Sequence, residues 1–366
     1  LALGEASVRF WPRPGLTLAG GRLRGSRATA ATAGDAGTAH GAYDVTFERV
    51  AVDVAVGPLL RRQAEISGLH VSGPTARLVW PGGGVTLRGY DLRVRNLALS
   101  LRDLARPGGA GGRSLPPGER IPADLGLVFD GRIEEVHWQE TVYEAVALAG
   151  ELDTRIVTVT GLRARHGGGV VDGQAEIAYD RDPHGETTFE ARIRNVAATA
   201  LLRPWAPALA DRLDGALSGR FSGACRLRDA RLRRESLDVT GRLTSDRGVL
   251  RAADWLAGIA PYLGDRQDLK TIEFSALEHD FRVDEGRYLV QDLWIDGAQT
   301  DWRGTGWIGL DGAIDVDLSV ALPPGFTPQL GQWSFLAEAL RDESGQIGLD
   351  LNLDGRAASP RVSLDL

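Results

Sequence analysis

Strict alternation of aliphatic and polar side chains near the C-terminus is the feature that most constrains the fold. Ile314, Val316, Leu318 and Val320 alternate with Asp315, Asp317 and Ser319, and Leu349, Leu351 and Leu353 alternate with Asp350, Asn352 and Asp354. Because successive side chains of a strand point to opposite sides, this period places the aliphatic groups on one face and the polar groups on the other. We therefore expect a sheet with one apolar face.

Short apolar runs separated by turn residues continue this pattern through most of the chain. The sequence contains 47 glycines and only 7% aromatic residues, which suits many strands and tight turns. In the N-terminal part, Val45 and Phe47 form one run, and residues 50–56 form a separate one. The predicted fold is mainly β, an elongated antiparallel sheet curled into an open groove or a sandwich-like structure, with two or three short amphipathic helices.

The helices are expected where the apolar spacing changes from two to three or four. Residues 199–213 fit one helix, with Thr199 as N-cap and with Pro204 and Pro207 breaking it into two pieces. Residues 255–263 and 330–340 carry two further stripes.

Composition divides the chain into four predicted regions. An N-terminal β region covers residues 1–105, and a loop rich in Gly and Pro covers 106–118. A middle β region covers 119–196, and a C-terminal β region with the short helices covers 197–366.

Several function classes are disfavoured by composition. The net charge is −7 and the arginines form no basic stripe, so no nucleic-acid partner is expected. Cys225 is the single cysteine and the six histidines lack ligand spacing, so we expect no disulfide and no metal site. No apolar run reaches the roughly 18 residues that span a bilayer. The chain contains no methionine, so we expect a native segment before Leu1.

Three motifs suggest chemistry and are better explained as strands and turns. Gly304, Gly306 and Gly309 fit a dinucleotide-binding pattern, but strand alternation follows them where a helix is required. Residues 350–355 fit half of a calcium loop, but Arg361 stands where a bidentate Glu is needed. Residues 166–169 resemble a lipase oxyanion loop without a nucleophile elbow. We predict no cofactor, no catalytic residue and no enzymatic activity.

The two ends of the chain resemble the AsmA family of bacterial envelope proteins, which is related to the TamB and YhdP group of bridge-like lipid transporters. At the C-terminus the resemblance rests on residues 281–287, 296–297, 302–312, 345–347, 353–355 and the closing Ser359-Pro360-Arg361-Val362. At the N-terminus it rests on residues 8–16, 47–50, 57–60 and 66–74. Both patterns consist of turn residues and aliphatic residues in the expected order.

This resemblance implies the periplasmic part of a protein tethered to the inner membrane of a Gram-negative bacterium by an N-terminal anchor. It also implies phospholipid binding or shuttling in a hydrophobic β groove that supports outer-membrane lipid homeostasis. The side chains expected to line that groove are Val52, Val54, Leu97, Leu99, Leu127, Phe129, Ile314, Val316, Leu318, Leu349, Leu351 and Leu353.

Three alternatives to a lipid groove stay open at this point, of which a hydrolase acting on glycans or lipids rests only on the abundance of carboxylates. Alternation reports which side of a strand is apolar and not what covers it, so a closed sandwich core fits the same pattern. An outer-membrane assembly or scaffold factor that binds proteins through exposed strand edges also fits.

Overall fold

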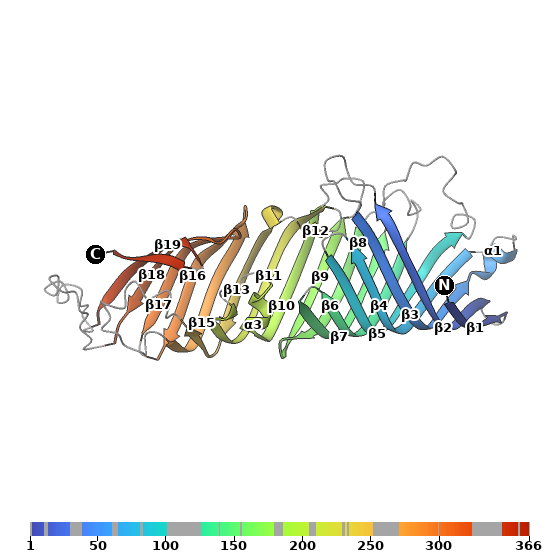
Figure 1. Cartoon of the computed structure of the whole chain (residues 1–366), viewed down its shortest axis with the longest axis horizontal. Coiled ribbons are helices and arrows are strands. Elements are labelled where there is room, and N and C mark those ends of the chain that lie inside the picture. Colours follow the sequence, from blue (N-terminus) through green and yellow to red (C-terminus); the bar gives the residue numbers. More distant parts are fainter. Residues whose placement is uncertain are drawn as a thin grey trace. The chain divides into compact units, whose positions relative to one another are not determined.

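The computed structural model describes most of the chain. The described residues are 2–10, 14–29, 39–60, 65–80, 83–100, 126–138, 140–153, 156–178, 186–204, 210–228, 231–232, 234–251, 271–298, 300–323, 346–357 and 359–365. Nearly all of them lie in β-strands, most of which pair antiparallel with the strand before or after them in the chain (Figure 1). The predicted antiparallel β fold is therefore confirmed.

Contacts between Cα atoms divide the chain into two compact units. Unit 1 contains residues 1–166, 172–187 and 227–231, and unit 2 contains residues 167–171, 188–226 and 232–366. The division runs through the end of the predicted middle region, and the predicted loop at 106–118 lies outside the described residues.

Unit 1 is a meander of long strands. Its strands are β1 (Ala2–Arg9), β2 (Gly15–Thr29), β3 (Ala39–Val54), β4 (Glu65–Trp80), β5 (Gly83–Ser100), β6 (Leu127–Trp138), β7 (Thr141–Asp153), β8 (Ile156–His166) and much of β9 (Gly169–Ala178). From β1 to β8 each strand pairs antiparallel with the next. The short helix α1 (Val56–Leu60) connects β3 to β4.

Unit 2 holds, wholly or in part, the remaining elements. They are β10 (Glu186–Ala197), α3 (Ala198–Leu202), β11 (Leu213–Arg228), β12 (Arg231–Leu232), the 3-10 turn η2 (Arg234–Ser236), β13 (Asp238–Ser245), β14 (Gly248–Arg251), β15 (Thr271–Asp284), β16 (Arg287–Gly297), β17 (Asp301–Gly309), β18 (Ala313–Ala321), β19 (Gly348–Arg356) and β20 (Ser359–Asp365).

Four strands of unit 2 form a closed set of pairings, β11 with β13, β13 with β15, β15 with β14 and β14 with β11. The register explains this ring. Strands β13 and β14 pair with β15 in the same register: Ser245 of β13 lies opposite Leu277, and Gly248 of β14 lies opposite Phe274. In their pairing with β11, the register shifts by one residue between β13 and β14. Strands β13 and β14 are therefore two parts of one interrupted row between β11 and β15.

The regular pairing between neighbouring strands of unit 1 is interrupted at corresponding positions from β1 to β7. We call this line of interruptions the crease. The crease consists of Gly4, Gly20, Glu48, Pro74, Gly89, Glu134 and Ala145, one residue from each of β1 to β7. In three of these strands, β2, β5 and β7, the residue has a left-handed backbone, with φ of +66° at Gly20, +56° at Gly89 and +48° at Ala145. Such residues locally reorient a strand without ending it.

The crease corrects the prediction of separate strands around residue 48. Among the buried or half-buried apolar side chains of β3 that are larger than alanine, Val45 and Phe47 precede the crease, and Val50, Val52 and Val54 follow it. The apolar face therefore switches from odd to even positions inside one continuous strand. Because regular alternation breaks at this switch, the sequence alone predicts a strand boundary there.

Helix α3 confirms a helix near residue 199 but not its predicted start. Its N-cap is Ala197, which ends β10 with an extended backbone and offers no side-chain cap, so Thr199 lies inside the first turn. The helix ends at Leu202, before Pro204. The predicted helices at 255–263 and 330–340 lie outside the described residues.

Buried side chains are distributed unequally between the units. Twenty-three of the 29 buried hydrophobic residues of the described chain belong to unit 2, and most of them form one cluster. The buried cluster of unit 1 contains only Ala76, Tyr90, Ile133, Val146 and Ala164, surrounded by half-buried aliphatic side chains. Unit 2 therefore has a conventional packed core, whereas unit 1 leaves much of its apolar side partly open to solvent.

Candidate apolar binding face

Three rows of apolar residues cross the strands of unit 1, because residues paired across antiparallel strands point to the same side of the sheet. The first row is Leu18, Val50, Val71, Leu92, Gly131, Leu148 and Leu162; the second is Leu16, Val52, Leu69, Val94, Phe129, Gly150 and Val159; the third is Leu23, Val45, Ala76, Leu87, Val136 and Tyr143. We call these three rows the apolar face.

The crease separates the third row from the other two, yet all three lie on one side of unit 1. Val45 and Leu87 of the third row and Val71 and Leu92 of the first pack against the same buried cluster. Since the switch in parity at the crease keeps aliphatic side chains on this side along each strand, the apolar face continues across it.

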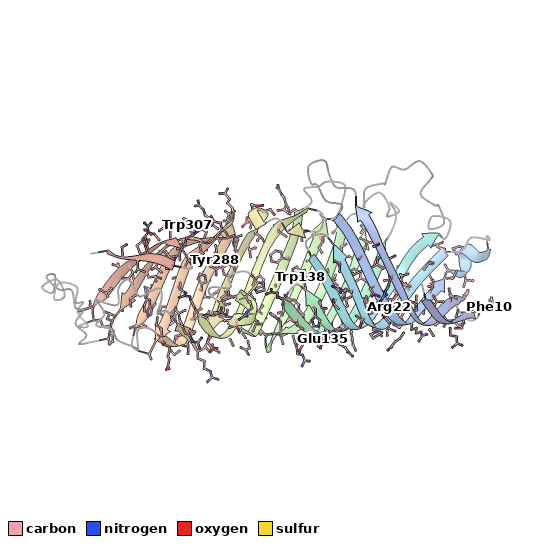
Figure 2. All side chains as sticks on the ribbon, in the orientation of Figure 1. Phe10, Arg22, Glu135, Trp138, Tyr288 and Trp307 are labelled. Atoms are coloured by element: carbon pink, nitrogen blue, oxygen red, sulfur yellow. The ribbon has the colours of Figure 1, made fainter. Side chains whose placement is uncertain are left out.

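The apolar face is incompletely covered. Its aliphatic side chains are mostly half-buried, and Leu16, Leu23 and Leu162 are more than a third exposed. All eleven exposed large hydrophobic residues of the described chain lie in unit 1. They are Val8, Phe10, Leu16, Leu23, Tyr43, Val56, Leu78, Trp138, Val142, Ile156 and Leu162, of which Phe10 and Trp138 are labelled in Figure 2. This concentration of exposed apolar surface marks a candidate binding surface.

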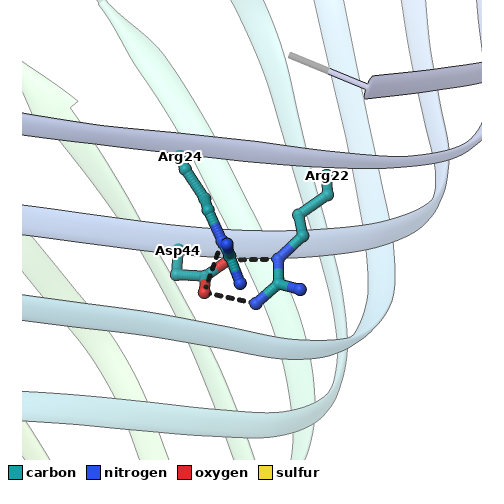
Figure 3. A network of polar contacts seen from close by, with 3 residues as sticks. All are labelled: Arg22, Arg24 and Asp44. Carbon is teal, nitrogen blue, oxygen red and sulfur yellow. Dashed lines mark hydrogen bonds and ion pairs between the residues drawn. The ribbon is translucent and has the colours of Figure 1, made fainter.

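The opposite side of unit 1 carries charged pairs. Arg22 of β2 binds both carboxylate oxygens of Asp44 on β3, with N–O distances of 2.7 and 2.5 Å, and Arg24 donates to the same carboxylate at 3.0 Å (Figure 3). The hydrogen bond from Arg22 is the largest of the effects that lower the pKa of Asp44 to about 2. Farther along the sheet, Arg95 donates to Asp130 at 2.6 Å. The charge–charge contacts on this side and the aliphatic rows on the other make unit 1 a two-faced sheet.

The predicted groove residues of unit 1 fall on or beside the apolar face. Val52 and Phe129 belong to its second row, Val54 pairs with Ile66, and Leu127 pairs with Leu152. Leu97 and Leu99 lie at the end of β5, and their side chains are outside the described part of the structure.

The predicted groove residues of unit 2 lie in its packed core. Ile314, Val316, Leu349, Leu351 and Leu353 are 2–6% exposed, and Leu318 packs against their cluster. They meet in register across β18 and β19, for example Val316 opposite Leu353. Since these side chains are already covered, we restrict the candidate site to unit 1.

Sequence reasoning missed most of the apolar face. Leu69, Val71, Leu92 and Val94 are as central to it as Val52 is. Alternation within each strand indicated which of its residues are apolar on one side. The register that aligns these residues across strands cannot be predicted from any single strand.

The motifs that suggested chemistry occupy strands and turns, as predicted. Gly304, Gly306 and Gly309 lie in β17, and the half calcium loop at 350–355 lies in β19. His166 ends β8, and its Nδ1 is 2.9 Å from the carbonyl oxygen of Val142.

The described residues contain neither a metal-binding cluster nor a membrane-spanning helix. No group of three or more His, Cys, Asp or Glu side chains in that part of the chain is arranged to hold a metal ion. None of the helices described there has the length and apolar character needed to cross a membrane.

No family model, no curated protein and no solved structure matches this chain. The resemblance to the AsmA family therefore stays a prediction from the residues quoted above.

Proposed function

We propose that unit 1 binds the acyl chains of a phospholipid on its apolar face and that the protein supports lipid homeostasis in a Gram-negative cell envelope. One observation carries the proposal: three rows of apolar residues, most of them aliphatic, run in register across up to seven strands and remain partly exposed. The rows contain no charged side chain. An acyl chain needs no hydrogen-bonding partner, so such a surface matches it chemically.

The energetic reason for such a surface is the cost of exposing hydrocarbon to water. Moving one CH₂ group from water to an apolar surface is worth about 0.8 kcal/mol, so even partial cover of a long acyl chain stabilises a complex by several kcal/mol. The half-buried side chains of unit 1 lose their own exposed area in the same step. No catalytic group is needed for this activity.

The cellular setting in this proposal comes from the resemblance at the two ends of the chain. It places the activity in the periplasm, with an anchor in the inner membrane, and makes the protein a lipid carrier or part of a lipid bridge. The partners are then phospholipid, the inner membrane and outer-membrane assembly proteins.

Native mass spectrometry with lipid extraction tests the proposal on protein purified gently from a Gram-negative host. We expect bound phospholipid in the unaltered chain and its loss in Val52→Asp and Leu162→Asp, which place a charge in the second and first rows. Ala51→Asp is the matched control, because Ala51 is adjacent to Val52 and points to the opposite side. Leu162 is 38% exposed, so a charge there leaves the fold intact.

Far-UV circular dichroism melts on each variant separate lost binding from lost folding. A chain that carries no phospholipid, or a folded Leu162→Asp variant that retains as much phospholipid as Ala51→Asp, would refute binding on this face.

A second candidate function is an assembly factor that binds proteins through a strand edge. The observation that favours it is strand β1, where Val8 is 60% exposed and Phe10, just beyond the strand, is 82% exposed. A protein of this class would bind its partner equally well after Val52→Asp, which leaves β1 unchanged.

A further inference from the structure

Strand β1 is an open edge of unit 1. Within the described part of the chain it pairs in register with β2 alone, and every residue from Gly4 to Phe10 is exposed. An edge strand presents unpaired backbone N–H and C=O groups along its free side, which makes it a template for another strand.

The side chains of β1 are arranged in two sets by the register with β2. Glu5, Ser7 and Arg9 share one side of the sheet, opposite Ala19, Thr17 and Gly15 of β2. Ala6 and Val8 point to the other side, opposite Leu18 and Leu16. Because Leu18 and Leu16 begin the first and second rows, Ala6 and Val8 extend the apolar face to the edge.

We propose that β1 pairs antiparallel with β1 of a second copy of this chain, with the two Ser7 residues opposite each other at a two-fold axis. In this register Glu5 of each copy faces Arg9 of the other, and Ala6 of each faces Val8 of the other. Both opposite-charge pairs form on the polar side, and both apolar pairs form on the apolar side. The strand is complementary to itself, as an interface with two-fold symmetry requires.

Other registers lose this match. A shift by one residue brings polar positions opposite apolar ones. A shift that centres the axis on Glu5 or on Arg9 places like charges directly opposite, which is unfavourable. Axes on Ala6 or Val8 keep the two sides in order but leave Glu5 and Arg9 without opposite charges across the interface.

The charges of β1 are compatible with this pairing. Arg9 reaches across Gly15, which has no side chain, to bind Asp53 of β3 at 2.9 Å. A guanidinium has five N–H donors in a planar fork, so a second carboxylate can share it. Glu5 has no ion-pair partner among the described residues, and the partner copy supplies one.

Pairing of this kind joins the apolar faces of two copies into one surface. A two-fold axis perpendicular to the sheet keeps the aliphatic rows of both copies on the same side. The dimer does not depend on lipid binding, because Glu5 and Arg9 lie on the polar side and the Val52 and Leu162 variants leave β1 unchanged.

Substitutions that reverse the charges of Glu5 and Arg9 in the full chain test the interface, with dimerisation measured by sedimentation velocity. We expect the unaltered chain to dimerise, and Glu5→Arg and Arg9→Glu each to weaken the dimer at least about tenfold, because two attractive pairs become two repulsive ones. The double variant Glu5→Arg/Arg9→Glu should restore dimerisation in part, since it exchanges the charges across the interface and keeps the register but loses the ion pair of Arg9 with Asp53. A monomeric unaltered chain, or a double variant as weak as the single ones, would overturn the proposal.

A cross-link at the axis provides an independent measurement. In a Cys225→Ala background, Ser7→Cys places two thiols opposite each other, close enough for a disulfide. Oxidation should convert this variant to a covalent dimer. Ser72→Cys, on the same side of the sheet but in the interior strand β4, is the matched control and should stay monomeric under oxidation. Equal cross-linking of both variants would contradict pairing through β1.

Discussion

The hydroxyl of Tyr90 on β5 donates a hydrogen bond of 3.0 Å to the carbonyl oxygen of Thr46 on β3, passing over the strand that lies between them. Gly73 of β4 makes this crossing possible. A Cβ atom at that position would lie 2.9 Å from the Tyr90 hydroxyl oxygen, and also too close to the backbone of β3. One glycine and one tyrosine therefore connect three strands beside the crease.

This arrangement predicts that Tyr90→Phe and Gly73→Ala act on the same contact. Tyr90→Phe removes the hydrogen bond and should reduce the free energy of unfolding by about 1 kcal/mol. Gly73→Ala displaces the ring and should cost about 2 kcal/mol or more. Because the alanine already breaks the bond, the double variant should be less destabilised than the two single losses together, and urea unfolding measures all three. Additive losses would show that Gly73 does not accommodate Tyr90.

The Asp44 carboxylate should titrate far below an ordinary aspartate. Its pKa of about 2 depends first on the hydrogen bond from Arg22 and to a lesser degree on Arg24. We expect Arg22→Ala to return the pKa of Asp44 towards its usual value near 3.8, and Arg24→Ala to raise it less. NMR titration of the carboxyl carbon measures both changes. An equal response to the two substitutions would contradict the two-point binding by Arg22.

The sign of the linked stability follows from the lowered pKa. The ionised form of Asp44 is favoured in the folded chain, so its contribution is present above the unfolded pKa near 3.8. It is lost as the pH falls through about 2.

The positive φ of Ala145 in the crease predicts a glycine substitution that stabilises. A left-handed backbone costs a non-glycine residue about 1–2 kcal/mol, whereas glycine gives up about 0.4–1 kcal/mol through the greater freedom of its unfolded chain. Ala145→Gly should therefore leave unit 1 as stable or up to about 1.6 kcal/mol more stable. Ala147→Gly, two residues along β7, is the control and should destabilise by about 0.5–1 kcal/mol. Thermal melts that rank the two variants in the reverse order would contradict strain at Ala145.

The crease also shows why sequence reasoning reached the fold class but not most of the apolar face. Within β18 and β19 the alternation is uninterrupted, so the face predicted from Val316 and Leu353 is the face on which they meet. In β3 the apolar side chains change parity between Phe47 and Val50, and only the ladder of neighbouring strands shows that the strand continues. Register is a property of strand pairs, and no single run of residues encodes it.

The sequence also did not predict whether other side chains cover an apolar face. Val52 and Leu351 have the same alternating surroundings, yet Val52 is half-buried and Leu351 is 2% exposed. The difference depends on which side chains from distant strands pack over each position. Periodicity contains no information on that packing.

Matched truncations should reveal this difference between the units. Leu351→Ala removes a fully buried side chain from the core of unit 2 and should cost about 2–5 kcal/mol. Leu69→Ala makes the same chemical change on the half-exposed apolar face of unit 1 and should cost less than about 2 kcal/mol, because less buried area is lost. Urea denaturation compares them. Equal losses would indicate that the apolar face is packed as tightly as the core.

A buried histidine predicts how unit 2 responds to acid. The Nε2 atom of His279 on β15 lies 2.7 Å from the hydroxyl of Tyr288 on β16, a residue labelled in Figure 2, beside the ring of Phe281. Burial lowers the pKa of His279, and its backbone contact with Asp292 and the charges of Asp280 and Asp292 oppose that shift only in part. The folded chain thus favours the neutral ring.

As the pH falls below the ordinary histidine pKa of about 6.5, the unfolded chain takes up this proton before the folded chain does. The stability of unit 2 should therefore be higher above that pH and decrease as the pH falls through it. His279→Gln keeps a polar partner for Tyr288 but cannot titrate, so its urea midpoint should vary less between pH 7 and pH 5, values on either side of about 6.5. His137→Gln is the control, since His137 lies in unit 1 on the polar side, 2.9 Å from Glu135. An unchanged acid dependence in His279→Gln would assign the effect to another group.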